Sequence, residues 1–491
     1  MIIGLDFGTS NCSVGIWRDG KPELLDIERG TKYLPSVFYT PRRDIKIEKI
    51  DDDKLAANVR DRLAEQKKES NLAKKQGRAY RELSENEIKA QETGVLLREA
   101  RAEAERQRQE QSLASTFESE EEMETFFGTS AINAHLSDPT DGFFVKSPKT
   151  FLGADLRSEQ LEAFREIVSR MLTFIKLQTE KTLNTTVQQV VIGRPVNFHG
   201  HRGVAGNKQA MEILTAAAYD AGFVEVEFLL EPVAAALDYE RTLTKTETIL
   251  VLDAGGGTTD CTMMILGPSF SSSADRTEQI LASLGDRVGG NDLDIKINYH
   301  QIMPQFGKNS LLKMGSRPIP NHIFFDAAAV NDVNAQNRFY SDQTGRTIDR
   351  DYLRQSEDPI LIQRLQHLWN TRATYLLNFH AEQIKIKLSD KIETSVAIDS
   401  ISPPTSVEVT RDQLSDAITK EISAFIELMQ QTIEQAGVKP DKIYITGGTG
   451  KSPLIRRAIY ETYPDIPVIQ GDSFGSITAG LTTWAQKRFS K

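Results

Sequence analysis

Two short segments of the chain carry nearly the same pattern. In each, an apolar β-branched run ends at an aspartate, and a turn rich in glycine and hydroxyl groups follows; the segments are Asp6–Ser13 and Asp253–Thr262. The two aspartates are 253 − 6 = 247 positions apart in a chain of 491 residues, so the repeat divides the chain almost in half. The repeat predicts a duplicated α/β fold with one strand–turn–strand unit in each half.

Charge and composition indicate which kinds of molecule the protein is expected to bind. The formal net charge of −10 argues against nucleic acid, because nucleic-acid-binding proteins usually present a basic surface. The chain opens on a strand-like run rather than a leader, and it has no unbroken apolar run of about 18 residues to cross a bilayer. We therefore expect a cytoplasmic protein without a membrane partner. The two cysteines, Cys12 and Cys261, are expected to be reduced and packed behind the glycine turns.

Local signals predict several elements between the two repeats and after them. Asp19-Gly20 predicts a hairpin turn after the first repeat. Helices are expected over 160–177 and 411–436, and a strand over 442–445 ends at a further glycine turn. The segment 50–125 is dense in Ala, Glu, Gln, Lys and Arg, which favours helix. Its apolar residues keep no unbroken heptad, so a solvated helical insertion is favoured over a coiled-coil partner site.

Glycine turns of this kind bind anions. The glycines let backbone N–H groups approach a phosphate closely, and neighbouring hydroxyl groups can donate further hydrogen bonds. The residues concerned are Gly8, Thr9 and Ser10 in the first turn, Gly255, Gly256, Gly257 and Thr258 in the second, and Gly447 and Gly448 in the third. Asp6 and Asp253 would repel the same phosphates, so their position predicts Mg²⁺ between carboxylate and phosphate.

Five motifs, taken in order, resemble the nucleotide-binding domain of the seventy-kilodalton heat-shock proteins, the Hsp70 or DnaK family. They are Asp6–Asn11, Glu231–Ala235, Asp253–Asp260, Gly289–Asp292 and Gly447–Thr449. Within the family the chain is most similar to the YegD-like chaperones. The resemblance implies the actin-like ATPase fold, in which duplicated ribonuclease-H-like domains form two lobes around a nucleotide cleft.

The resemblance also implies domain boundaries. The first lobe covers 1–245 and is completed by the C-terminal helix within 472–491, and the charged helical insertion 50–125 belongs to it. The second lobe covers 246–471 and contains an inserted subdomain over 291–409. The chain ends soon after the segment that resembles the last helix of the ATPase domain, so we expect it to lack a peptide-binding domain.

Roles for single residues follow from the same resemblance. Asp6 and Asp253 match the residues around Mg²⁺, and Lys149, Glu231 and Asp260 match catalytic positions. Lys149 would stabilise charge that develops on the transferred phosphoryl group, and Glu231 would orient the attacking water. The residues implied to contact ATP or ADP are Gly8, Thr9, Ser10, Asn11, Gly255, Gly256, Gly257, Thr258, Gly289, Gly290, Glu382, Lys385, Gly447, Gly448, Thr449 and Lys451.

The residues expected to contact the adenosine part of the nucleotide depart from the family pattern. Ile386 stands where the family usually has an arginine that stacks on adenine, and Lys451 stands where a second stacking arginine is common. Lysine lacks the planar guanidinium that makes such stacking favourable. The phosphate chemistry is therefore better defined by the sequence than the selectivity for adenine.

The function expected from these features is Mg²⁺-dependent ATP binding with slow ATP hydrolysis, in a DnaK-like chaperone. A small-molecule kinase of the sugar-kinase type shares the fold and is an alternative, which requires a catalytic aspartate base beside a bound sugar. A second alternative is a scaffold in which nucleotide controls the access of a protein partner to the 50–125 insertion.

Overall fold

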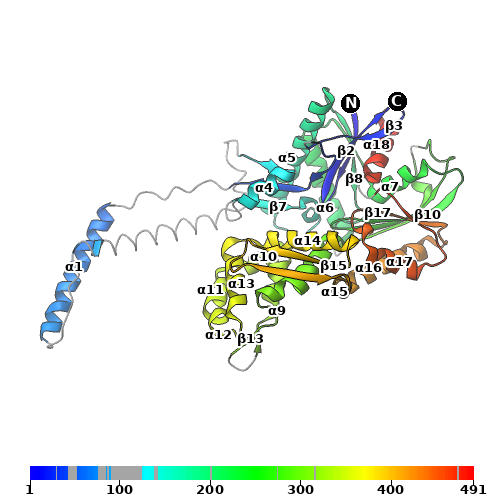
Figure 1. Ribbon diagram of the computed structural model, residues 1–491. Coiled ribbons are helices and arrows are strands. Elements are labelled where there is room, and N and C mark those ends of the chain that lie inside the picture. Colours follow the sequence, from blue (N-terminus) through cyan, green and yellow to red (C-terminus); the bar gives the residue numbers. More distant parts are fainter. Residues whose placement is uncertain are drawn as a thin grey trace. The chain divides into compact units, whose positions relative to one another are not determined.

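The computed structural model describes the chain except residues 29, 42–51, 76–84, 86–87, 90–123, 138–141, 199–201, 274, 314–316, 473–474 and 491. Mixed α/β architecture with several sheets is seen throughout the described part (Figure 1). The chain divides into two compact units, one formed by 1–41 with 123–491 and the other by 42–122. Much of the predicted 50–125 insertion lies outside the described residues.

The first sheet carries the first glycine turn at the end of its central strand. Its strand order is β3-β2-β1-β8-β9, and β4 also pairs with β2. The bounds are β1 (Ile2–Phe7), β2 (Asn11–Arg18), β3 (Lys21–Leu24), β4 (Leu34–Pro35), β8 (Gln189–Arg194) and β9 (Glu225–Leu230). Strand β1 is antiparallel to β2 and parallel to β8. The turn between β2 and β3 has positive φ angles at Asp19 (52°) and Gly20 (76°), which confirms the predicted hairpin.

The second sheet repeats this topology. Its strand order is β12-β11-β10-β17-β18, with β10 antiparallel to β11 and parallel to β17. The bounds are β10 (Glu247–Ala254), β11 (Thr259–Leu266), β12 (Ile280–Asp286), β17 (Lys442–Thr446) and β18 (Val468–Gln470). Strand β10 is an apolar run whose core residues are fully buried, as expected for a central strand covered on both faces. Each central strand therefore carries an aspartate, Asp6 or Asp253, at its second-to-last position, just before a glycine turn.

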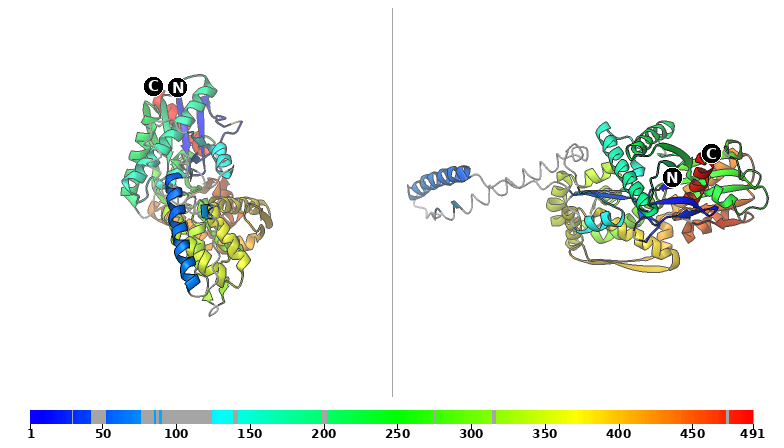
Figure 2. Two further views of the ribbon diagram at one scale, coloured as in Figure 1. Left: turned by 90° about the vertical axis from the view of Figure 1, so that its left-hand side faces the viewer. Right: turned by 90° about the horizontal axis from the view of Figure 1, so that it is seen from above.

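Helices cover the faces of the two sheets. Those nearest the glycine turns are α5 (Ser158–Leu183), α6 (Gly203–Asp220), α7 (Glu231–Glu240), α8 (Gly290–Ile297), α14 (Thr374–Asp390), α16 (Thr419–Ala436), α17 (Pro453–Thr462) and α18 (Ser476–Phe489). The C-terminal helix α18 packs on β1, β2, β8 and α7, and Figures 1 and 2 show it beside the N-terminal strands. The closest approach is at Gly480, where an added Cβ would lie 1.8 Å from the carbonyl oxygen of Ala234. Only glycine fits this crossing.

The remaining elements of the main unit form smaller layers beside the sheets. Strands β5 (Val37–Thr40), β6 (Phe126–Phe127) and β7 (Phe143–Lys146) pack against α4 (Gly128–Ser137) and lead into the 3₁₀ turn η1 (Pro148–Phe151). The others are β13 (Leu311–Leu312), β14 (Arg317–Pro318), α9 (Asn321–Ala328), α10 (Val333–Phe339), α11 (Asp342–Thr347), α12 (Leu353–Gln355), α13 (Pro359–Thr371), β15 (Glu393–Ile398), β16 (Thr405–Thr410) and α15 (Arg411–Ala417).

One predicted helix is divided. The sequence predicts a single helix over 411–436, but α15 ends at Ala417 and α16 begins at Thr419. Between them, Ile418 has φ −112° and ψ 14°, so its backbone is not helical. Its side chain is buried in the core, and we attribute the break in the helix to this packing. The start of α15 is fixed by a capping box, in which Thr410 and Gln413 exchange hydrogen bonds.

The second unit contains α1 (Asp52–Lys75), so the composition-based expectation of helix is met over these residues. Leu55, Val59 and Ile88 form a small buried cluster, with Leu63 packed against it.

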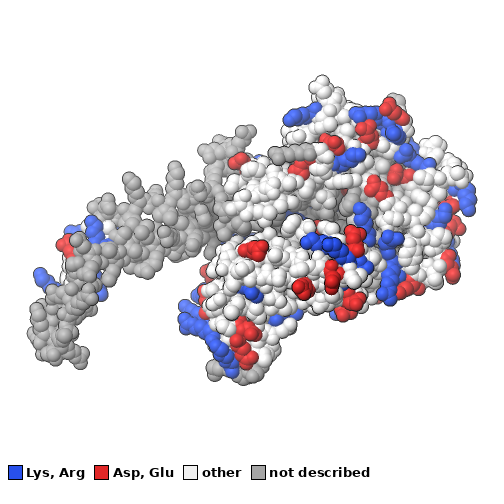
Figure 3. All heavy atoms as spheres, viewed as in Figure 1, with Lys and Arg blue, Asp and Glu red and all other residues white. Residues whose placement is uncertain are grey.

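None of the helices in the described ranges has the length and apolar character needed to span a bilayer. Lysine and arginine are interspersed with aspartate and glutamate over the face shown in Figure 3.

A buried ion pair ties the segment after β11 to α7. The two guanidinium Nη atoms of Arg276 each donate to one carboxylate oxygen of Glu240 at 2.8 Å, and both side chains are 2% exposed. Glu240 also accepts from the backbone N–H of Gly267 at 2.9 Å. The guanidinium and the carboxylate thus share two hydrogen bonds, whereas the buried Nε of Arg276 has no hydrogen-bond partner among the described residues.

We expect Arg276→Ala to lower the free energy of unfolding by roughly 3–5 kcal/mol, because it leaves the Glu240 carboxylate buried and unpaired. Urea unfolding measures the change. Arg457→Ala is the control, since Arg457 pairs with Glu461 on an exposed helix face and its loss should cost less than about 1 kcal/mol. Equal effects of the two substitutions would contradict the prediction.

Candidate functional site

The two repeated glycine turns face each other in the structure. A Cβ added to Gly256 would lie 2.0 Å from the Oγ of Ser10, and one added to Gly257 would lie 2.6 Å from the Cγ2 of Thr9. The turns that join β1 to β2 and β10 to β11 are thus in contact, and side chains on the second turn would prevent it. Residues 247 positions apart in the sequence form one site.

Two further glycine segments converge on the second turn. The backbone N–H groups of Gly290 and Asn291 donate to the carbonyl oxygens of Gly255 and Gly256 at 3.0 and 2.7 Å. From the third turn, the Thr449 hydroxyl donates to the Gly255 carbonyl at 2.8 Å. Gly447 has φ +80°, and its Cβ position is only 2.2 Å from the carbonyl oxygen of Ala254. Gly289 and Gly448 lie in these same two segments, so the predicted phosphate-binding backbone is gathered around one turn.

An acidic cluster lies behind the turns. Ligand oxygens of Glu231, Asp253 and Asp260 all lie within 4.8 Å of one another, and the three side chains are buried. Asp253 and Asp260 are cross-strand partners on β10 and β11, and Glu231 is the first residue of α7. One oxygen of Asp260 accepts from the backbone N–H of Val196 at 2.8 Å. The other accepts from the Thr258 hydroxyl at 3.3 Å.

Burial and the charge of Glu231 raise the pKa values of three aspartates near the turns, Asp6, Asp253 and Asp260. Burial, followed by the charge of Glu231, raises the pKa of Asp6 to about 7 and that of Asp260 to about 8. The same two causes raise the pKa of Asp253 well above its usual value. A divalent cation between these carboxyl groups would favour their ionised forms, so the cluster is suited to a metal.

Lys149 is the cation inside this cluster. It lies on η1, is 3% exposed, and donates a hydrogen bond to Glu231 within a buried ion pair. Burial alone would lower the pKa of Lys149, but the carboxylates of Glu231 and Asp6 raise it above its usual value. The ammonium group therefore stays charged beside the acidic groups, where it can also face an anion.

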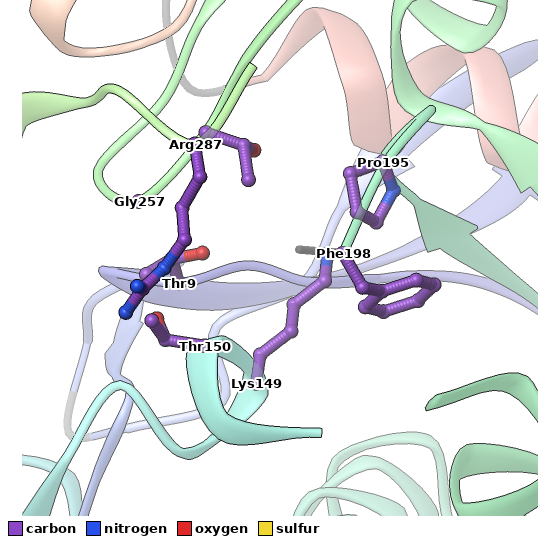
Figure 4. A pocket seen from close by; sticks show the side chains of 8 residues that line it. Thr9, Lys149, Thr150, Pro195, Phe198, Gly257 and Arg287 are labelled. Atoms are coloured by element: carbon purple, nitrogen blue, oxygen red, sulfur yellow. The ribbon is translucent and has the colours of Figure 1, made fainter. Parts of the chain in front are cut away.

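A small pocket opens at the point where Lys149 meets the two turns. It has a volume of about 10 Å³, room for about one water, and is lined by Thr9, Lys149, Thr150, Pro195, Phe198, Gly257, Thr258 and Arg287. Figure 4 shows Lys149 rising from η1 and Arg287 reaching toward Thr9 and Thr150 from the opposite side. Arg287 was assigned no role from the sequence; it lies two residues before the motif Gly289–Asp292.

The predicted adenosine-binding residues separate onto two faces of α14. Glu382 pairs with Lys146 of β7 at 2.8 Å, which holds the pKa of Glu382 below its usual range against the effect of burial. Glu382 and Ile386 line a second pocket of about 200 Å³, together with Ser10 and Asn11. Aromatic and apolar side chains form the rest of its wall, among them His135, Phe144, Tyr375 and Phe379.

Lys385 points away from this second pocket. Its Nζ donates to the Gly290 carbonyl at 3.0 Å and pairs with Asp294 at 2.7 Å. The carboxyl group of Asp294 is completely buried, and burial raises its pKa to about 6 in spite of Lys385. Lys451 is exposed at the end of the 3₁₀ turn η6 (Thr449–Lys451) and does not line the 200 Å³ pocket.

The raised pKa of Asp294 predicts a pH-dependent stability. The folded protein holds this proton up to about pH 6, whereas the unfolded chain loses it near 3.8, so the stabilisation is complete below about pH 4 and lost as the pH rises through 6. Asn cannot ionise. Between pH 4 and 7, Asp294→Asn should therefore gain up to roughly 3 kcal/mol of stability relative to the wild type in urea unfolding. A difference that does not vary with pH would contradict this assignment.

The residues present fit a magnesium-bound polyphosphate. Among the described residues, the buried Oδ1 of Asp253 has no hydrogen-bond partner, as expected for an atom that faces a hydrated cation. At the contact between the turns, the backbone of Gly256 and Gly257 faces the side chains of Ser10 and Thr9, so backbone N–H groups and hydroxyl groups would both be near bound phosphates. Carboxylate oxygens and the absence of sulfur or imidazole donors from the cluster favour Mg²⁺ over softer metals.

The fold and this site define an α/β protein with a buried acidic cluster behind paired glycine turns. A family model described as Hsp70 protein matches residues 2–121, 144–318 and 361–468. The chain belongs to the Hsp70 family, so the resemblance drawn from the five motifs is confirmed at this level. The narrower YegD-like assignment stays a prediction.

Two curated relatives are both named chaperone protein DnaK. One, from Endomicrobium trichonymphae, is 25% identical over 316 residues, which cover 62% of this chain and 39% of that protein. The other, from Emiliania huxleyi, is 26% identical over 298 residues, which cover 60% of this chain and 36% of that protein. The chain thus spans less than two fifths of the length of these relatives.

Proposed function

We propose that the chain binds Mg-ATP between two lobes of an actin-like ATPase fold and hydrolyses it slowly. The observation that carries the proposal is the buried Lys149–Glu231 pair beside Asp253 and Asp260, at the meeting point of two glycine turns. Membership of the Hsp70 family supports ATP as the nucleotide. The repeated sheet topology supports the two-lobe arrangement, with the boundaries 1–245 with 472–491, and 246–471. The subdomain 291–409 within the second lobe belongs to the same proposal.

In the proposed reaction, each group has one task. The glycine turns bind the phosphates through backbone N–H groups, helped by the Thr9, Ser10 and Thr258 hydroxyls. Mg²⁺, held by Asp6 and Asp253 through its waters, would neutralise phosphate charge. The water oxygen forms a bond to the γ-phosphorus while the bond to the bridging oxygen breaks; the electron pair stays on ADP, and the proton leaves with the phosphate.

Glu231 and Lys149 would position the attacking water and stabilise the charge that develops. Because the two side chains are paired and buried, neither has to reorganise when the reaction occurs. Asp260 is held by Val196 and Thr258, so it can orient the second turn without moving. The three predicted catalytic residues are thus within one connected group of charges.

Phosphate release from Mg-ATP alone tests the proposal. Slow release without any added sugar is the expected result. Nucleotide binding with no hydrolysis until a sugar is added would favour a small-molecule kinase, and nucleotide binding with no turnover under either condition would favour a nucleotide-controlled scaffold. Failure to bind nucleotide in calorimetry would overturn both the ATPase and the kinase.

A DnaK-like chaperone role is the cellular part of the proposal, and the names of the relatives support it. The 50–125 insertion is the proposed contact with a protein partner. A pull-down that compares the intact chain with a chain lacking this segment tests the contact; the same partners in both samples would refute it. The expected cytoplasmic location and the expected lack of a peptide-binding domain stay predictions.

A further inference from the structure

We propose that Arg287 is a second cationic group of the reaction, which binds the oxygens of the phosphoryl group as it is transferred. The inference rests on the proposed function and deepens it. Arg287 is absent from the set of residues that the motifs single out, and its place in the pocket with Lys149, Thr9 and Thr258 is what assigns it this role.

The backbone around Arg287 is fixed on both sides. Its own N–H donates to the Asp286 carboxylate at 2.7 Å, and the carbonyl of the next residue, Val288, accepts from the Thr259 hydroxyl at 2.6 Å. Asp286 ends β12, which pairs with β11. The stem of the arginine is therefore anchored to the strand that follows the second glycine turn, and the side chain reaches across the pocket toward Thr9 and Thr150 (Figure 4).

The charges around the pocket leave Arg287 available for an anion. Lys149 and Arg287 are the two lysine or arginine side chains among the described residues that line it. Lys149 is already paired with Glu231. The guanidinium of Arg287 makes no ion pair or side-chain hydrogen bond with any residue that the structure describes. The charge of Arg287 acts on the carboxyl group of Asp292. Burial raises the pKa of Asp292, and the positive charge of Arg287 opposes that rise.

A guanidinium matches the geometry of a transferred phosphoryl group. Its planar donors can bind two phosphate oxygens at once, which an ammonium cannot do. In the loose transition state of phosphoryl transfer, charge is spread over the equatorial oxygens and the leaving oxygen. Arg287 lies across the pocket from Lys149, so the two cations would hold the group from opposite sides. This interaction would be stronger in the transition state than with bound ADP.

Substitution of Arg287 combined with a transition-state analogue tests the inference. We expect Arg287→Ala to slow ATP turnover at least about tenfold and to weaken binding of ADP with aluminium fluoride by a similar factor. Affinity for ADP alone should change less than about twofold. Arg287→Lys should turn over ATP faster than Arg287→Ala but more slowly than the wild type, because lysine keeps the positive charge but lacks the planar pair of donors of the guanidinium. Added guanidinium should raise the turnover of Arg287→Ala.

The control is Arg457→Ala, an exposed arginine on α17 that should leave every one of these measurements unchanged. Normal turnover in Arg287→Ala would overturn the inference while leaving the ATPase in place. Equal losses of affinity for ADP and for its aluminium fluoride complex would also overturn it, since the arginine would then bind the ground state. Failure of the wild-type chain to bind nucleotide would instead remove the proposed function, and the role of Arg287 with it.

Discussion

Lys149→Met should lower the rate of ATP hydrolysis by roughly 100-fold to 1000-fold. The ammonium is buried beside Glu231 and faces the pocket where the two glycine turns meet, so its charge acts in a site from which water is largely excluded. Loss of one such preorganised group typically costs this much in rate. Single-turnover phosphate release measures the change, and ADP binding by calorimetry shows whether the nucleotide still enters.

Lys208→Met is the matched control, because Lys208 is a lysine on α6 whose side chain is 76% exposed. It should hydrolyse ATP at the wild-type rate. Circular dichroism and thermal unfolding of Lys149→Met separate a catalytic loss from misfolding, since the substitution also leaves Glu231 without its partner. A folded Lys149→Met protein with wild-type turnover would show that the lysine serves structure alone.

Asp253→Ala should abolish Mg²⁺-dependent nucleotide binding or turnover. Asp253 is the second-to-last residue of β10, is 3% exposed, and has an oxygen with no hydrogen-bond partner among the described residues. Removing the carboxylate takes away a charge that would hold the hydrated cation between protein and phosphate. A titration of turnover and of nucleotide affinity against Mg²⁺, with EDTA as the zero point, measures the loss.

Asp253→Asn keeps the shape of the side chain but removes its charge. It should lose Mg²⁺-dependent nucleotide binding or turnover as Asp253→Ala does, which would show that the charge is the cause. Asp155→Ala removes an exposed aspartate and should leave the Mg²⁺ titration unchanged. A Mg²⁺ response of Asp253→Ala equal to that of the wild type would show that the metal binds elsewhere.

The strands and glycine turns were predictable because their signals are local. An apolar run, an aspartate and a glycine-rich turn specify a strand end whatever lies around them, and the repeat showed that the pattern occurs twice. The division of the 411–436 helix at Ile418 was not predictable, because the sequence is compatible with one continuous helix. The break depends on how that isoleucine is buried in the core.

In the candidate site, too, some residues could be predicted from local sequence signals and others could not. Asp253, which belongs to a motif, and Lys149, which matches a family position, could be singled out from the sequence. Arg287 and Asp294 could not, because a single charged residue outside the motifs is usually solvated. Their positions follow from the path of β12 and α8 past the second turn, which is a property of the whole fold. The ion pair between Lys146 and Glu382, 236 residues apart, is another example.

The crossing of α7 and α18 at Gly480 and Ala234 has a mechanical consequence. The two helix backbones touch directly, and sliding one along the other would drive residues with larger side chains into the contact. Rotation about the contact meets no such obstacle. The crossing therefore favours rotation of the two helices about their contact over sliding of one helix along the other.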